Sequence, residues 1–170
     1  PAASSGGAPP PAAVNGMAAG AGCALALACD LRVMADDAHL MMAFSNIGFV
    51  PDSGASWLFV RQIGYSRAFE LAAEATPIPA ERCLALGLTN RVVPADGLQD
   101  ATATWAHSLA QRPTLALGLT KRALHAAQEQ SLEATLETEA RLQMEAVQSH
   151  DHREGVQAFL EKRDPEFEGR

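Results

Sequence analysis

The feature that most constrains the fold is a turn of small residues, Gly20-Ala21-Gly22, placed between a short apolar run and a compact Ala/Leu segment. A bend of this kind between a strand and a helix leaves backbone N–H groups unpaired at the positive end of the helix dipole. Because glycine and alanine have little or no side chain, a ligand atom can approach the main chain closely. The turn therefore predicts an anion site, suited to a phosphate, a carboxylate or a developing oxyanion.

Two other interpretations of the turn stay open on spacing alone. Close packing of a helix against a strand would need the same small residues without any ligand. A dinucleotide-binding turn would use Asp36 or Asp37 as the ribose ligand at the end of the next strand. However, Leu25 stands where the third glycine of that motif belongs, and the helix is short for a parallel crossover. The nicotinamide interpretation is therefore disfavoured.

Periodicity and turn residues predict an α/β domain in which short strand–helix units are followed by helices. Ser66 is expected to cap a helix, and Gly87 is expected to end one in the left-handed conformation. Residues 1–11 are rich in Pro, Gly and Ser and are predicted to be flexible. The predicted strands are 31–35, 39–44 and 91–93, and the predicted helices are 23–29, 55–62, 67–75, 80–86, 98–111, 114–128, 131–149 and 153–162.

Composition excludes several classes of protein. Apolar residues make up 48% and charged residues 19% of the chain, as in a folded protein. The net charge of -7 argues against broad nucleic-acid binding, and the apolar runs are too short and interrupted for a membrane span. The three cysteines are odd in number and lie in apolar surroundings, so we expect buried thiols in a reducing cytoplasm. The histidines show no metal-like clustering, and no signal peptide is expected.

Several blocks, in the same order along the chain, resemble the crotonase (enoyl-CoA hydratase/isomerase) family. They are AAVNGMAAGAG at 12–22, LALACDLR at 25–32, and the segments 47–53, 79–94 and 154–167. The resemblance implies that 12–94 forms the C-terminal part of a crotonase-like ββα spiral core, incomplete at the N-terminus. It also implies that 95–170 forms a helical region used for trimerisation.

The resemblance further implies an enzyme that acts on acyl-CoA thioesters. The Ala21 N–H would be one of two oxyanion-hole donors, each worth about 3 kcal/mol of transition-state stabilisation. Coenzyme A would be part of the substrate, with no other cofactor and no metal. Lys162 matches a family position near the CoA moiety, although a solvated surface lysine is an equal alternative. The substrate contacts that the resemblance implies are Met17, Gly20, Ala43, Phe44 and Lys162.

The family comparison also bears on the acid and base. Ala24 and Phe44 stand where family hydratases carry their two glutamates, so ordinary hydration is disfavoured. Asp52 lies in VPDSG, which resembles the block of ring 1,2-epoxyphenylacetyl-CoA isomerases and Δ3-Δ2-enoyl-CoA isomerases. One carboxylate suffices for a 1,3-proton shift, with Phe44 as apolar wall. Spacing alone favours Asp52 as a helix N-cap, whereas the family match favours catalysis.

We therefore expect an acyl-CoA isomerase with Asp52 as acid and base. The alternatives are an enoyl-CoA hydratase-like or other crotonase-family enzyme, and a catalytically incomplete crotonase-like subunit. Complete relatives carry a further N-terminal half with the second oxyanion donor, and Pro9-Pro10-Pro11 occupies the place of an apolar strand, so the sequence suggests N-terminal truncation. The resemblance also implies a homotrimer, or a hexamer of two stacked trimers, in the cytoplasm.

Overall fold

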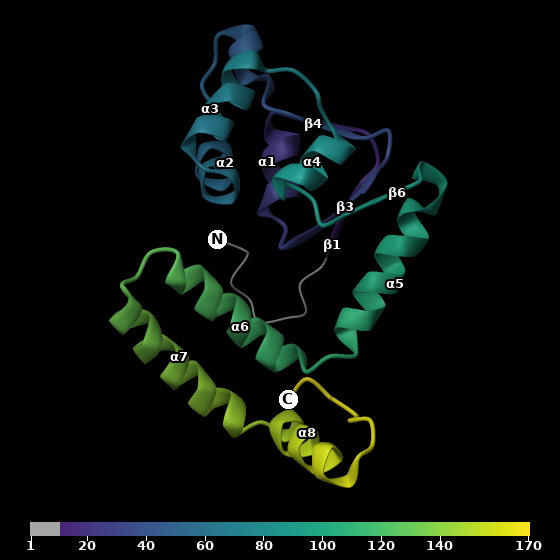
Figure 1. Ribbon diagram of the computed structural model, residues 1–170, viewed down its shortest axis with the longest axis vertical. Helices are drawn as coiled ribbons and strands as arrows, with labels where there is room; N and C mark the ends of the chain where they lie inside the picture. Colours follow the sequence, from purple (N-terminus) through teal and green to yellow (C-terminus); the bar gives the residue numbers. More distant parts are fainter. Residues whose placement is uncertain (1–10) are drawn as a thin grey trace. The chain divides into compact units, whose positions relative to one another are not determined.

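The computed structural model describes residues 11–170 and divides them into two compact units (Figure 1). The first unit runs from the start of the described chain to Trp105, and the second runs from Ala106 to Arg170. The predicted flexible segment lies outside the described residues except for Pro11. That residue begins the first strand, although the sequence placed it in the flexible segment. Pro11 lies at the first position of an edge strand, where a missing N–H is tolerated.

The first unit contains two three-stranded sheets. One is parallel, with the order β1-β3-β6, and pairs Ala13 with Val33 and Met34 with Val92. In the other sheet, β4 lies between β2, which is parallel to it, and β5, which is antiparallel. The strands are β1 (Pro11–Val14), β2 (Met17–Ala19), β3 (Leu31–Ala35), β4 (His39–Met41), β5 (Ile78–Pro79) and β6 (Arg91–Val93).

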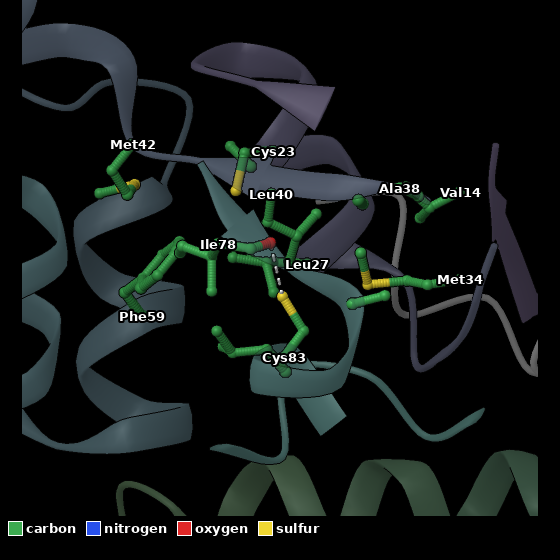
Figure 2. Close-up of a cluster of buried hydrophobic side chains, with 14 of the residues drawn as sticks. Val14, Cys23, Leu27, Met34, Ala38, Leu40, Met42, Phe59, Ile78 and Cys83 are labelled. Atoms are coloured by element: carbon green, nitrogen blue, oxygen red, sulfur yellow. Dashed lines mark hydrogen bonds between the residues drawn. The ribbon is translucent and has the colours of Figure 1, made fainter. Parts of the chain in front are cut away.

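Helices pack against these sheets and bury one apolar core. Figure 2 shows Phe59 and Leu27 in one cluster with strand residues such as Leu40, and all three side chains are almost completely buried. Burial of such large side chains contributes about 1.5–3 kcal/mol each. The helices of this unit are α1 (Ala21–Ala28), the 3-10 helix η2 (Ala43–Ile47), α2 (Ala55–Ile63), α3 (Tyr65–Glu74), α4 (Ala80–Leu86), the 3-10 helix η3 (Ala95–Gly97) and the first part of α5 (Leu98–Ala110).

Three sequence-based boundaries in this unit are wrong. The strand predicted over 39–44 ends at Met41, and Ala43 and Phe44 begin η2, which Gly48 closes by donating its N–H to Ser45. Helix α1 begins at Ala21 rather than at residue 23, so part of the small-residue turn is already helical. Ser66 does not cap α3, because the N-cap is Gly64 and the helix starts at Tyr65.

The second unit is helical. It consists of the end of α5, then α6 (Thr114–Ala127), α7 (Leu132–Val147) and α8 (His150–Glu161). Helices α6 and α7 lie side by side (Figure 1) and bury Leu119 and Leu142. Ser131 and Ser149 accept hydrogen bonds from backbone N–H groups at the starts of α7 and α8. Ser149 is therefore the N-cap of α8, and the helix begins at His150, three residues before the predicted start at 153.

No helix within residues 11–170 combines the length and the apolar character that crossing a membrane requires.

Candidate functional site

The turn that leads into α1 is fixed by backbone hydrogen bonds from both sides. The Gly20 N–H donates to the Met41 carbonyl over 2.9 Å, which joins the turn to the end of β4. The Gly20 carbonyl accepts from the Ala24 N–H over 3.1 Å and begins the helix. Between these bonds Gly20 adopts φ 53° and ψ -120°, a conformation that side chains disfavour. Glycine at position 20 is therefore required by the local geometry.

The first backbone donors of α1 point out of this turn. The N–H groups at the start of any α-helix have no partner within the helix, and Ala21 is the first residue of α1. Ala21 and Gly22 are exposed, and the first turn of the helix contains no acidic side chain. The first turn of the helix therefore lies at the surface, with no acidic side chain at the positive end of the helix dipole.

The Phe44 ring lies beside the turn. A Cβ built on Gly20 would lie 3.8 Å from Phe44 Cζ, which is ordinary van der Waals contact. Phe44 is 7% exposed and belongs to the core, while its neighbour Ala43 is half-buried. The structure therefore brings Gly20 and Phe44 together and places an apolar surface next to the open donors.

A hollow of about 360 Å³ lies between the β1–β2 segment and α1. Met17 lines it and remains 55% exposed, and Gly22 and Leu25 contribute from the helix. The predicted contact residue Met17 and the first turn of α1 therefore border the same depression. Its lining is mostly apolar, which suits an acyl chain or another apolar group.

Asp52 is exposed in the segment before α2 and accepts a 2.9 Å hydrogen bond from the Ser53 hydroxyl. Its carboxylate does not cap α2. The N-cap is Gly54, without any side-chain cap, and the Ala55 N–H donates to the Asp52 backbone carbonyl. The capping interpretation is therefore wrong, and helix capping does not account for this carboxylate.

Lys162 belongs to the second unit. It is the C-cap of α8 in the left-handed conformation, with φ 56°, and its N–H donates to the Phe159 carbonyl. The Lys162 side chain is exposed. The residue therefore has a structural role at the end of the helix, whatever its ammonium group binds.

The buried side chains near the start of α1 are apolar or are weakly acidic thiols. Ala24 is buried and cannot move a proton, as is also true of Phe44. Burial raises the pKa of the Cys23 thiol to about 12 and that of Cys83 to about 11. These thiols are therefore protonated at neutral pH and do not act as nucleophiles there.

Sequence reasoning missed a buried charge at the other end of α1. Arg32 in β3 is 5% exposed, and its Nε donates to the Leu88 carbonyl while Nη1 donates to the Cys29 carbonyl, both over 2.6 Å. Burial lowers the pKa of this guanidinium, but arginine stays charged at physiological pH. The available signal was a charged residue inside the otherwise apolar strand LRVMA. Within residues 11–170, no group of three or more His, Cys, Asp or Glu side chains is arranged to hold a metal ion.

Comparisons with known proteins identify the family of this chain. The pattern of the enoyl-CoA hydratase/isomerase family matches residues 4–170. A protein called probable enoyl-CoA hydratase from Rhodobacter capsulatus is 48% identical over 94% of this chain, and 1,2-epoxyphenylacetyl-CoA isomerase from Escherichia coli is 43% identical over 93%. The chain belongs to the enoyl-CoA hydratase/isomerase, or crotonase, family.

Solved structures show the same fold. Subunit I of an enoyl-CoA hydratase from Geobacillus kaustophilus superposes with a TM-score of 0.92 at 38% identity, over 94% of this chain and 62% of its own. An enoyl-CoA hydratase from Bacillus anthracis superposes with a TM-score of 0.90 at 33% identity, again over 94% and 62%. The chain spans 62% of the Rhodobacter protein and 60% of the Escherichia coli isomerase.

Proposed function

We propose that this chain contributes the oxyanion donor and the proton-transferring carboxylate of an acyl-CoA thioester isomerase. The observation that carries the proposal is the Ala21 N–H at the exposed start of α1, next to Gly20, which lies against the apolar Phe44 ring. An N–H donor in this position can stabilise the negative charge that develops on a thioester oxygen when a proton leaves the adjacent carbon. Family membership supports a CoA thioester as the source of that oxygen.

In the proposed mechanism, Asp52 removes a proton from one carbon of a 3-enoyl thioester. The electron pair moves towards the thioester oxygen, and the resulting dienolate is stabilised by the Ala21 N–H. The same carboxylic acid then returns its proton two carbons away, and the double bond migrates without any net gain or loss of atoms. A single carboxylate is sufficient because its proton is recovered. Support comes from the exposed, non-capping carboxylate and from the 43% identity to an isomerase.

A hydratase-like reaction is the second candidate, favoured by the 48% identity to a protein called probable enoyl-CoA hydratase. Against it, Ala24 and Phe44 are both apolar and buried, so neither can activate water. A third possibility is a catalytically incomplete subunit, since the chain spans 62% of that relative.

Substrate contacts follow from the same proposal. Met17 and Gly20 would border the acyl group near the turn, Ala43 and Phe44 would exclude water, and Lys162 would attract the phosphates of CoA. Coenzyme A would be part of the substrate, with no separate cofactor. We propose assembly into a trimer or hexamer through the second unit, whose helices expose many apolar side chains. The protonated, buried thiols fit a reducing compartment such as the cytoplasm.

The test follows double-bond migration in a 3-enoyl-CoA with the intact protein. Asp52→Asn should lower the rate by about 100-fold or more, because loss of a general acid–base group typically costs that much. Asp37→Asn removes a carboxylate from an exposed turn and is the matched control, which should keep the full rate. Undiminished migration in Asp52→Asn, or a product heavier by one water, would contradict the proposed reaction.

A further inference from the structure

The C-terminal end of α1 is held by two side chains, which we call the Arg32–Gln62 clamp. Arg32 Nη1 donates to the carbonyl of Cys29 over 2.6 Å and to that of Leu27 over 3.3 Å. Gln62 Nε2 donates to the same Leu27 carbonyl over 3.3 Å. Arg32 Nη2 donates to Gln62 Oε1 over 3.3 Å, which joins the two side chains. The clamp thus binds carbonyls that an α-helix leaves unpaired at its end.

Arg32 is itself held in place by further hydrogen bonds. The Arg32 N–H donates to Asn90 Oδ1 over 2.8 Å, and the Arg32 carbonyl accepts from the Asn90 N–H over 3.1 Å. The Arg32 Nε donates to the Leu88 carbonyl over 2.6 Å. Arg32 therefore joins α1 to β3, to α2 through Gln62 and to the segment between α4 and β6. These contacts involve residues far apart in the sequence.

Helix α1 needs such a clamp because its own sequence holds it weakly. It has eight residues, Gly20 at its N-cap supplies no side-chain hydrogen bond, and Cys29 at its C-cap supplies only a weak one of 3.6 Å from its Sγ to the Leu25 carbonyl. Its buried face consists of Cys23, Leu27 and two alanines, so a single large aliphatic side chain interlocks with the core. A helix of this length is about 12 Å long and behaves as one body. A shift at the Cys29 end would therefore move the Ala21 N–H equally.

The positive charge of Arg32 also stabilises the C-terminal end of α1. The carbonyl end of a helix carries partial negative charge, and a cation there is favourable. Because Arg32 is buried, this attraction is screened far less than it would be at the surface. The guanidinium therefore holds the helix both by directed hydrogen bonds and by charge.

We propose that Arg32, together with Gln62, is a positioning residue that sets the axial position of α1 and thereby the position of the Ala21 donor. This rests on the proposed function for the Ala21 N–H, but the clamp itself can be tested without it. Arg32 touches no substrate in this scheme and acts through the helix.

The first test is amide hydrogen exchange of the intact protein without ligand. Gln62→Leu should speed exchange of the α1 amides at least about tenfold relative to those of β3, because it removes two clamp bonds and leaves the core intact. Arg32→Met should have a larger effect, and Arg32→Lys an intermediate one, since lysine keeps the charge but loses the guanidinium fork. Arg82→Met is the matched control, because it removes a guanidinium from an exposed ion pair with Glu70. Unchanged α1 exchange in Gln62→Leu and Arg32→Lys would overturn the clamp.

The second test separates kcat from KM in 3-enoyl-CoA isomerisation. Displacing the donor should lower kcat by about tenfold in Gln62→Leu and up to about 100-fold in Arg32→Met, with KM nearly unchanged and partial rescue in Arg32→Lys. Faster α1 exchange with a normal kcat would overturn the positioning role but leave the proposed function standing. An inactive wild type with a clamp-dependent exchange rate would instead reject the proposed function and retain the clamp.

Discussion

At Gly20 the backbone conformation limits the choice of residue more than the available space does. A Cβ would find the Phe44 ring at an acceptable 3.8 Å, but φ 53° with ψ -120° is unfavourable for any side chain. We expect Gly20→Ala to lower the free energy of unfolding by about 1–3 kcal/mol. Urea titration followed by circular dichroism measures this change.

Gly22→Ala is the matched control for that change. Gly22 is helical, and a Cβ there would meet no atom within 4 Å. Because alanine has the higher helix propensity, Gly22→Ala should be neutral or should stabilise by up to about 1 kcal/mol. An equal loss of stability in both variants would contradict the assignment of strain to Gly20.

The three cysteines should differ sharply in reactivity. Cys29 is half-buried, whereas Cys23 and Cys83 are fully buried, and burial raises their pKa values to about 12 and about 11 (Figure 2). At pH 8 an aromatic disulfide reagent should therefore modify Cys29 first in the native protein. The other two should react only as the protein unfolds. Cys29→Ser should abolish the fast phase, and a fast phase that survives would contradict this order.

The same thiols make stability depend on alkaline pH. Their folded pKa values lie above the ordinary value of 9.0, so an unfolded chain loses these protons first. Their contribution is fully present below pH 9 and is lost as the pH rises from about 9 through about 11 and 12. Urea midpoints should fall over that range, and less so in a Cys83→Ala variant measured against its own value at pH 7.

At the scale of elements, local signals predicted structure wherever a single segment determines it. Strand β3 and helix α4 were confirmed at their predicted positions, and Gly87 ends α4 at φ 76°, as a left-handed C-cap should. The 39–44 strand was wrong because η2 depends on a turn at Met42 and on Gly48, which periodicity does not reveal. A break near Ser149 was predicted, but the start of α8 at His150 was placed too late, because serine is acceptable near a helix end and is also a good N-cap.

Only the contiguous part of the candidate site could be predicted from the sequence. The Gly20-Ala21-Gly22 turn could be found from sequence because its donors, its small residues and the following helix are contiguous. The capping interpretation of Asp52 could be rejected only in three dimensions, where Gly54 occupies the N-cap. The Arg32 clamp could not be predicted, because its partners Gln62, Leu88 and Asn90 are distant in sequence.

Helix α8 also organises the end of the chain, through a carboxylate in its first turn. Asp151 is buried and accepts hydrogen bonds of 2.8 and 2.9 Å from the N–H groups of Glu168 and Gly169, while its own N–H donates to the Arg170 carbonyl. Asp151→Ala should release residues 164–170, because two backbone donors lose their acceptor. Limited proteolysis should then cut the tail much faster. Asp164→Asn, at an exposed position, should leave the tail protected, and equal cleavage in both variants would contradict this anchoring role.

At the scale of the whole molecule, the two units differ in how they use apolar residues. The unit that ends at Trp105 has one apolar core that includes Phe59, Leu27 and Leu40, although it also exposes large apolar side chains such as Phe69. The unit from Ala106 onwards buries only Leu119 and Leu142 among its large apolar side chains and leaves many exposed on α7 and α8. A lone helical unit that exposes Phe159 and Leu160 gains by burying them against another protein surface.

The proposed self-assembly can therefore be tested at Phe159, which is 82% exposed. Phe159→Glu should dissociate the oligomer, because assembly would bury a charge without a partner. The dissociated chain should keep the far-ultraviolet circular dichroism spectrum and the thermal melting of a folded protein. Sedimentation velocity measures the change in mass. Tyr65→Glu, at a 72% exposed aromatic residue of the other unit, is the matched control and should assemble normally. An intact oligomer in Phe159→Glu, or dissociation by Tyr65→Glu alone, would show that the contact lies outside the exposed face of α8.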